Sequence, residues 1–247
     1  MNAGKVCDQL VRWLEANLQR SGAEGLAVGL SGGIDSAVAA ALAQRAAPGR
    51  TLGVLMPCHS NLEDQADAER VARHVGIPHV VVDLSPVYDI LARALQPTLP
   101  AEADPGRLQL ARANVKPRLR MLTLYHAANV RGYLVVGTGN RSELYTGYYT
   151  KYGDGGVDLL PLGDLVKGEV RELARYLELP EAIIQRTPSA GLWEGQSDEG
   201  EMGITYAELD RYLLEGAAAP ELLARIEALH RVSRHKRELP PIPRVAR

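Results

Sequence analysis

The first 150 residues alternate between two patterns of apolar and polar positions. Short apolar stretches rich in β-branched residues are typical of buried parallel strands, and the segments between them carry apolar residues at helical spacing. Strands and helices that alternate in this way predict an α/β fold, a doubly wound parallel sheet with helices on both faces. The predicted strands are Leu26–Leu30, Leu52–Met56, His79–Val82 and Tyr133–Val136, and the predicted helices are Ile34–Ala46, Asp64–Val75, Pro86–Leu95 and a long one around Leu108–Val130.

The last third of the chain reads differently. It predicts helices at about Lys167–Leu177, Tyr206–Glu215 and Pro220–Arg231, before a proline-rich tail. Two segments rich in glycine and polar residues, Gly147–Val157 and Pro188–Gly203, indicate loops. Such loops often close over a substrate, and the plainer interpretation is that they only connect elements at the surface.

One residue inside the long helical pattern limits where a helix can run. Pro117 would cost about 3 kcal/mol in a helix interior. We therefore expect a helix to begin near Pro117, which bears on the direction of the neighbouring Arg118 side chain.

Composition narrows the class of protein. The 247 residues are 46% hydrophobic and 23% charged, without an internal repeat, which predicts a single domain over residues 1–247. A net charge of -2 argues against a nucleic-acid partner, although the run Arg231–Arg237 is locally basic. No apolar run reaches the ~20 residues of a membrane helix, and residues 1–20 do not resemble a secretory signal. Two cysteines without metal-ligand spacing agree with a cytoplasmic location.

Polar or glycine-rich residues follow three of the predicted strands directly. In open parallel sheets, ligands bind at the carboxyl ends of the strands, so these segments should border one cleft. They are Ser31-Gly32-Gly33, Pro57-Cys58-His59 and Gly137-Thr138-Gly139-Asn140.

The loop after the first strand has the chemistry of a phosphate site. Gly32 and Gly33 permit positive φ and leave no Cβ to block a phosphate. The helix that starts near Ile34 offers free N–H groups and the positive end of its dipole. Asp35, in the first turn, could hold a Mg²⁺ that neutralises the same polyphosphate. A tight turn with a serine cap is the structural alternative. The loop lacks the Gly-Lys-Ser/Thr of a Walker sequence and the spacing of a dinucleotide fingerprint.

The string from Ser31 to Ser36 resembles the pyrophosphate loop of the ATP pyrophosphatases, which activate an oxygen by transferring AMP to it. Three further segments narrow the choice: Val136–Glu143 leading into Thr146–Gly156, then Pro188–Glu199, and finally His235-Lys236-Arg237. Together with the loop they resemble NAD synthetase in its short form without a glutaminase domain, and the resemblance runs from about Leu26 to Pro243.

The resemblance implies an adenine nucleotide α-hydrolase-like fold and a set of binding residues. ATP, the co-substrate, would contact Gly29, Leu30, Ser31, Gly32, Gly33, Ile34, Asp35, Ser36, Thr138, Lys167 and Ser189. Deamido-NAD would contact Arg118, Lys151, Asp158, His235 and Lys236, and Mg²⁺ would be held by Asp35 and Glu143. Ser189 stands where many members have Thr, and Asn140-Arg141 replaces an Asp-His pair common in bacterial members. The basic segment around His235 is, on its own, equally typical of a solvated terminus.

The implied reaction is the ATP-dependent amidation of deamido-NAD by ammonia through an acyl-adenylate, which gives NAD, AMP and pyrophosphate. Phosphoryl transfer depends on positioning and charge stabilisation, for which Lys167 is suited. Asp154, in the glycine-rich loop, is a candidate to deprotonate ammonium, although Asp between glycines is also common turn chemistry. The resemblance further implies a homodimer with the deamido-NAD site across its interface. The alternatives are another adenylating amidotransferase, a tRNA-thiolation enzyme, or a non-catalytic nucleotide sensor.

Overall fold

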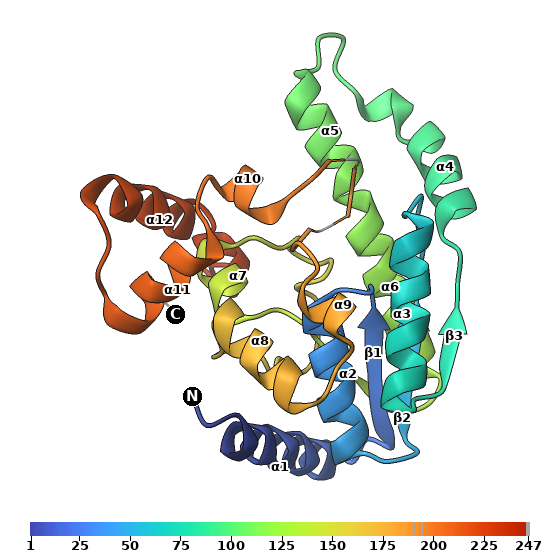
Figure 1. Cartoon of the computed structure of the whole chain (residues 1–247). Coiled ribbons are helices and arrows are strands. Elements are labelled where there is room, and N and C mark those ends of the chain that lie inside the picture. The colour runs from blue at the N-terminus through green and yellow to red at the C-terminus, as the bar shows by residue number, and fades with distance from the viewer. Residues whose placement is uncertain (190, 194, 246–247) are drawn as a thin grey trace.

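The computed structural model describes residues 1–189, 191–193 and 195–245, drawn in Figure 1. The strands are β1 (Gly25–Leu30), β2 (Thr51–Leu55), β3 (His79–Val81) and β4 (Tyr133–Val136). The helices are α1 (Ala3–Ser21), α2 (Ile34–Ala46), α3 (Leu62–Val75), α4 (Ser85–Ala94), the 3₁₀ turn η1 (Gln96–Thr98), α5 (Pro105–Ala113), α6 (Val115–Asn129), α7 (Arg141–Thr146), α8 (Lys167–Tyr176), α9 (Glu181–Ile184), α10 (Asp198–Met202), α11 (Tyr206–Glu215), α12 (Pro220–Val232) and α13 (Arg234–Arg237).

The sheet is parallel and has the order β3-β2-β1-β4. All four predicted strands are confirmed, each bound to within one residue. β1 pairs with β2 on one side and with β4 on the other, so the direction of winding changes at β1. A crevice opens at such a switch point, outside the carboxyl ends of the strands.

Helices cover both faces of the sheet, as predicted. Alternate side chains of β1 enter different cores: Leu26 and Val28 belong to the core with α1, α2, α3 and α8, whereas Ala27 belongs to the core with α4 and α6. Figure 1 shows α1, α2 and α8 together on one side of β1. Strands β1 and β2 are buried on both faces, which explains their nearly continuous apolar sequences. The edge strand β3 is exposed, so the expectation of a buried strand at His79–Val82 was wrong in that respect.

Several parts of the chain differ from the predicted elements, and the short helices α7, α9 and α13 were not predicted. The long helix expected around Leu108–Val130 is two helices, α5 and α6, and Pro117 lies in the first turn of α6. That position is tolerated because the first-turn N–H groups have no intrahelical acceptor, and the expected helix start near Pro117 is confirmed. Helix α1 was not predicted, although its buried residues Cys7, Leu14 and Leu18 have helical spacing.

The segment Pro188–Gly203 is not a loop throughout, so that prediction was wrong in part. It contains α10, which Ser197 caps by accepting a hydrogen bond from the Gly200 N–H. The rest has no regular element among its described residues, and Ala190 and Glu194 lie outside the described part of the chain.

The C-terminal helices form a small core of their own beside α7. Met202, Ile204, Tyr206, Leu209 and Ile226 make up its buried residues. This cluster brings α10 to the open end of the sheet, on the side of α7 and α8 (Figure 1).

Within the described residues, no helix combines the length and apolar character needed to cross a membrane.

Candidate active site

A cleft of about 1090 Å³ opens where β1, β2 and β4 end. Its lining residues come from segments that are far apart in the sequence. This is expected of a crevice at the strand β1, where the direction of winding changes. Among the residues proposed from the sequence, those that line it are Gly29, Leu30, Ser31, Gly33, Ile34, Asp35, Ser36, Arg118, Thr138, Glu143, Lys151, Asp154, Lys167, Ser189, His235 and Lys236.

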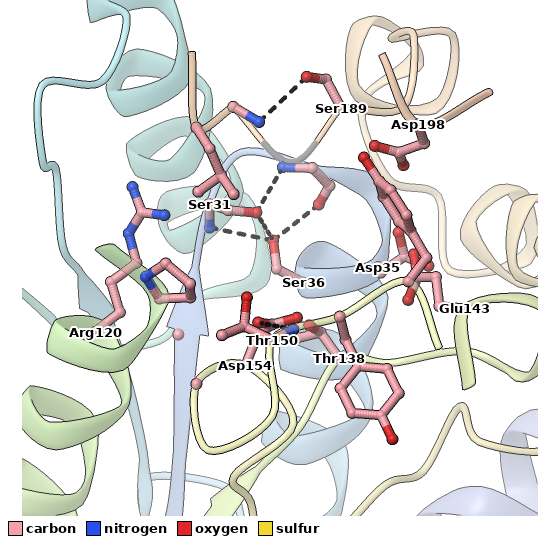
Figure 2. A pocket seen from close by; sticks show the side chains of 18 of the residues that line it. Ser31, Asp35, Ser36, Arg120, Thr138, Glu143, Thr150, Asp154, Ser189 and Asp198 are labelled. Atoms are coloured by element: carbon pink, nitrogen blue, oxygen red, sulfur yellow. Dashed lines mark hydrogen bonds between the residues drawn. The ribbon is translucent and has the colours of Figure 1, made fainter. Parts of the chain in front are cut away.

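The loop after β1 is braced by its own hydroxyl groups. The Ser36 hydroxyl donates to the Gly33 carbonyl at 2.8 Å and lies 3.2 Å from the Ser31 hydroxyl, which accepts from the Gly33 N–H (Figure 2). Gly33 caps α2 without a side-chain hydrogen bond. The first N–H groups of α2 therefore keep their capacity to bind an anion.

Gly32 lies on the side of this loop that faces α3 and does not line the cleft. Its φ is +80°, in the left-handed region. A Cβ there would come within 2.6 Å of the Asp64 carbonyl oxygen on α3. Glycine is therefore required for two reasons, the backbone conformation and the close approach of α3.

A buried ion-pair cluster closes one side of the cleft. Lys167, at the start of α8, is 2% exposed, and its Nζ donates to Asp35 Oδ2 at 2.6 Å and to Glu143 Oε1 at 3.4 Å. Burial raises the pKa of the Glu143 carboxyl to about 8, with Lys167 opposing the shift. Burial alone would lower the pKa of Lys167, but Asp35 and Glu143 together hold it above its ordinary value. The ammonium is therefore charged and bridges the two predicted metal ligands.

Asn140 orients both carboxylates, a role that sequence reasoning missed. It caps α7, where its side-chain oxygen accepts from the Glu143 N–H and its own N–H donates to Glu143 Oε2. Its Nδ2 donates to Asp35 Oδ1 at 2.9 Å. The spacing from Asn140 to Glu143 is that of a capping box, so half of this arrangement was visible in the sequence.

Asp154 and Thr150 lie across the cleft from the serines of the loop (Figure 2). Asp154 Oδ1 accepts from the Thr150 N–H at 2.9 Å. The Asp154 side chain is exposed to the space of the cleft, but protein surrounds that space, and this enclosure raises the pKa of the carboxyl despite the hydrogen bond. A carboxylate with a raised pKa is a better proton acceptor than a fully solvated one.

The basic residues near the C-terminus reach the cleft. Lys236 donates to the carbonyl oxygens of Gly147 and Tyr149, each at 2.6 Å, and its Nζ lies 5.2 Å from the centre of the Tyr149 ring. Lys151 donates to the carbonyl oxygen of His235. Burial lowers the pKa of Lys236. This segment is thus tied to the glycine-rich loop, and Lys236 is not the freely solvated side chain of the alternative interpretation.

Asp158 lies away from the other proposed deamido-NAD contacts. Its Oδ1 accepts from the Tyr125 hydroxyl and its Oδ2 from the Val135 N–H, beside β4. It borders a shallow hollow with Arg20 and Leu134. The cleft of a single chain therefore does not bring Asp158 together with Lys151.

Arg120 also lines the cleft and Lys116 lies beside it, and no sequence pattern pointed to either residue. Arg120 donates to the Met56 carbonyl and to the Ser60 hydroxyl, and Figure 2 shows it opposite Asp35. Lys116 is 8% exposed and donates to the Leu192 carbonyl at 2.7 Å. Arg118, which the sequence did propose, is exposed and makes a long hydrogen bond of 3.4 Å to the Lys151 carbonyl.

The segment that carries Ser189 is anchored at its base. Arg186 forms ion pairs with Asp64 and Asp67 of α3. The Ser189 hydroxyl, at the rim of the cleft, donates to the Gln196 carbonyl at 2.8 Å. Together these contacts hold the segment over the loop that follows β1.

The chain is similar to one family model and to several known proteins. The family model described as NAD synthase matches residues 6–240. An NH(3)-dependent NAD(+) synthetase of Carboxydothermus hydrogenoformans is 52% identical over 236 residues, which cover 96% of each chain. The structure of NMN synthetase from Francisella tularensis is similar with a TM-score of 0.92 and 38% identity, covering 99% of this chain and 100% of that one. An NH3-dependent NAD synthetase from Campylobacter jejuni gives a TM-score of 0.80 and 28% identity, with the same coverage.

Proposed function

The chain belongs to the NAD synthase family, and we propose that it amidates the nicotinate carboxylate of deamido-NAD with ammonia, at the expense of ATP, to give NAD, AMP and pyrophosphate. One observation carries the proposal. A single cleft is bordered by three groups of residues. They are the braced loop after β1, the ion-pair cluster of Asp35, Glu143 and Lys167, and the basic side chains of Arg118, Lys151 and Lys236.

The first chemical step in this proposal is adenylation. The carboxylate attacks the α-phosphate of ATP, an acyl-adenylate forms, and pyrophosphate leaves. The N–H groups at the start of α2 lie where they would stabilise the charge on the departing diphosphate. Lys167 adds a positive charge at the same place, which Asp210 helps to fix by accepting hydrogen bonds from the N–H groups of Lys167 and Gly168.

Asp35 and Glu143 are the residues that would hold Mg²⁺. Both carboxylates already contact one cation, the Lys167 ammonium, so their oxygens converge on a common point. Carboxylate oxygens supplemented by phosphate and water are the ligands that Mg²⁺ prefers. Bound there, the ion would neutralise charge on the triphosphate.

The second step is the attack of ammonia on the adenylate, with AMP as the leaving group. Ammonia must be neutral to attack, and most of it is ammonium near pH 7. The enclosed carboxylate of Asp154 would bind the ammonium and take its proton.

Replacing Asp154 by Asn tests this role. We expect turnover at limiting ammonium to fall by about 10²-fold, because the amide cannot accept the proton. The adenylation step, followed as pyrophosphate release in a single turnover without ammonium, should change little. Full turnover of the Asp154→Asn variant at limiting ammonium would exclude Asp154 as the proton acceptor.

A second candidate substrate is the mononucleotide counterpart of deamido-NAD, nicotinate mononucleotide. The observation that favours it is the likeness to an NMN synthetase, which exceeds the likeness to the NAD synthetase from Campylobacter jejuni in both TM-score and identity. The two substrates share the nicotinate carboxylate and differ in the adenylyl half.

The decisive experiment compares kcat/KM for deamido-NAD and for nicotinate mononucleotide, with ammonium and with glutamine as nitrogen donors. We expect deamido-NAD and ammonium to be preferred, with AMP and pyrophosphate formed in equal amounts with the amide. A preference for the mononucleotide would support the second candidate. Formation of ADP would contradict adenylation, and modification of a tRNA or a purine would support the other enzymes of the loop family. A nucleotide sensor would turn over none of these substrates.

We also propose that the enzyme is a cytoplasmic homodimer whose deamido-NAD site is completed at the interface. Apolar side chains remain exposed around β3, α4 and α6, including Val81, Ile90 and Leu122, which are 47%, 61% and 63% exposed. The position of Asp158 outside the cleft supports a site that extends beyond one chain. Sedimentation at low protein concentration tests the dimer.

A further inference from the structure

Asp198 has no part in the reaction derived above, yet it is a buried carboxylate beside the cleft. It is the first residue of α10, is 5% exposed and lines the cleft. Figure 2 shows it above Asp35 and Glu143, on the same side of the cleft. Its Oδ2 accepts from the Tyr206 hydroxyl at 3.0 Å. Its Oδ1 is buried and has no hydrogen-bond partner among the described residues.

A buried carboxylate oxygen without a donor is costly, so the site must supply a donor in some state of the enzyme. The Tyr148 hydroxyl also lies near the Asp198 carboxyl and lowers its pKa, but its proton is donated to Glu201. The cation whose charge lowers the pKa of Asp198 is Lys167. Its Nζ lies 4.8 Å from the centre of the Tyr206 ring, and the Tyr206 hydroxyl holds Asp198. Lys167 and Asp198 are close enough for the charge of each to shift the pKa of the other.

Lys167 occupies the point on which the proposed metal ligands converge. Its Nζ lies 2.6 Å from Asp35 Oδ2 and 3.4 Å from Glu143 Oε1. Mg²⁺ binds carboxylate oxygens at 2.0–2.1 Å, and two cations cannot share that space. Metal binding therefore requires the ammonium to leave. A buried ammonium that loses both counter-ions needs another one nearby.

We propose that Asp198 is a positioning residue that receives the Lys167 ammonium through its unpartnered Oδ1 when a divalent cation takes its place between Asp35 and Glu143. One rotation of the lysine side chain then satisfies two needs, the acceptor that lacks a donor and the cation that lacks a counter-ion. Lys167 thus competes with the metal in the nucleotide-free enzyme, and Asp198 reduces that competition. When ATP is present, the phosphates offer the ammonium a further acceptor.

This inference rests on the proposed metal site, and Mn²⁺ alone, added to nucleotide-free full-length protein, is the probe. Free Mn²⁺ is measured by electron paramagnetic resonance. The proteins compared are the wild type, Asp198→Asn, Lys167→Gln and the double variant. Glu201→Gln is the matched control, because it removes another carboxylate of α10 that lines the cleft and that Tyr148 and Gln196 bind.

We expect Lys167→Gln to tighten Mn²⁺ binding by on the order of tenfold, because the competing charge is gone. Asp198→Asn should weaken binding by on the order of tenfold in the wild-type background and by less than about threefold in the Lys167→Gln background. Tyr206→Phe, which removes the hydroxyl that holds Asp198, should act in the same direction as Asp198→Asn but less strongly. Glu201→Gln should bind Mn²⁺ as the wild type does.

Two results would contradict the proposed role of Asp198 without contradicting the metal site. An equal loss of affinity from Asp198→Asn in both backgrounds would make Asp198 a metal ligand or a distant charge. An unchanged or weaker affinity in Lys167→Gln would show that the ammonium does not compete. Absence of Mn²⁺ binding in every variant would instead remove the metal site itself, whereas amidation of deamido-NAD is measured separately and decides the proposed function.

Discussion

Replacing Asp35 by Ala is expected to lower the turnover of deamido-NAD by on the order of 10²-fold or more. The change removes a carboxylate from the first turn of α2, where it contacts Lys167 and accepts from Asn140. Two functions are lost together, one of the two proposed oxygen ligands of the divalent cation and the counter-ion that positions the lysine. A steady-state assay at saturating ATP, Mg²⁺ and ammonium measures the effect.

The control for Asp35→Ala is Asp8→Ala, which removes an exposed aspartate from α1. This variant should retain the turnover of the wild type. We expect Asp35→Ala to fold, because the Glu143 contact remains available to Lys167. Circular dichroism and thermal unfolding check this. A folded Asp35→Ala variant with turnover within tenfold of the wild type would contradict the assignment of the metal and the phosphates to this end of the cleft.

Replacing Gly32 by Ala is expected to cost about 3 kcal/mol of unfolding free energy and at least tenfold in turnover. The left-handed backbone accounts for about 1–2 kcal/mol, and the contact between the new Cβ and the Asp64 carbonyl for about 1–3 kcal/mol. Because that carbonyl belongs to α3 and cannot move as a side chain does, the loop itself must shift. A shift of the loop misplaces the N–H groups that would bind the phosphates.

Gly49→Ala separates the two contributions. Gly49 has a φ of +72°, close to that of Gly32, but a Cβ there would meet nothing within 4 Å. This control should lose only the backbone contribution of about 1–2 kcal/mol and keep its turnover. Urea unfolding measured on both variants tests the difference. Equal losses would show that the approach of α3 to Gly32 has no energetic consequence.

Sequence patterns located the strands and the loop after β1 because both are encoded by residues that are adjacent in the chain. A strand buried on both faces must be apolar almost throughout, so β1 and β2 were recognisable. The exposed edge strand β3 was recognisable from its run of β-branched residues. The loop from Ser31 to Ser36 was recognisable because its glycines and serines stand where a strand ends and a helix begins, a position at which phosphates commonly bind. Even the role of Asn140 was half visible, as a helix cap three residues before Glu143.

Other features depended on contacts between distant segments. Nothing near Lys167 in the chain indicates that its ammonium lies between Asp35 and Glu143, since Asp35 is 132 residues away. Asp198 belongs to a segment that the sequence assigned to a loop, and a helix of five residues leaves too short a pattern to detect. Asp158 was grouped with Lys151 from the resemblance, yet its carboxylate turns toward Tyr125 and β4.

The amino-acid sequence by itself thus determined the parallel sheet, the glycine-rich loop between β1 and α2 and the family, because periodicity and short motifs are properties of neighbouring residues. Only the tertiary structure decided which charges meet in the cleft. The reason is physical: the position and the pKa of a buried group such as Glu143 depend on burial and on partners that arrive from other parts of the chain, and these exist only once the fold has closed around them.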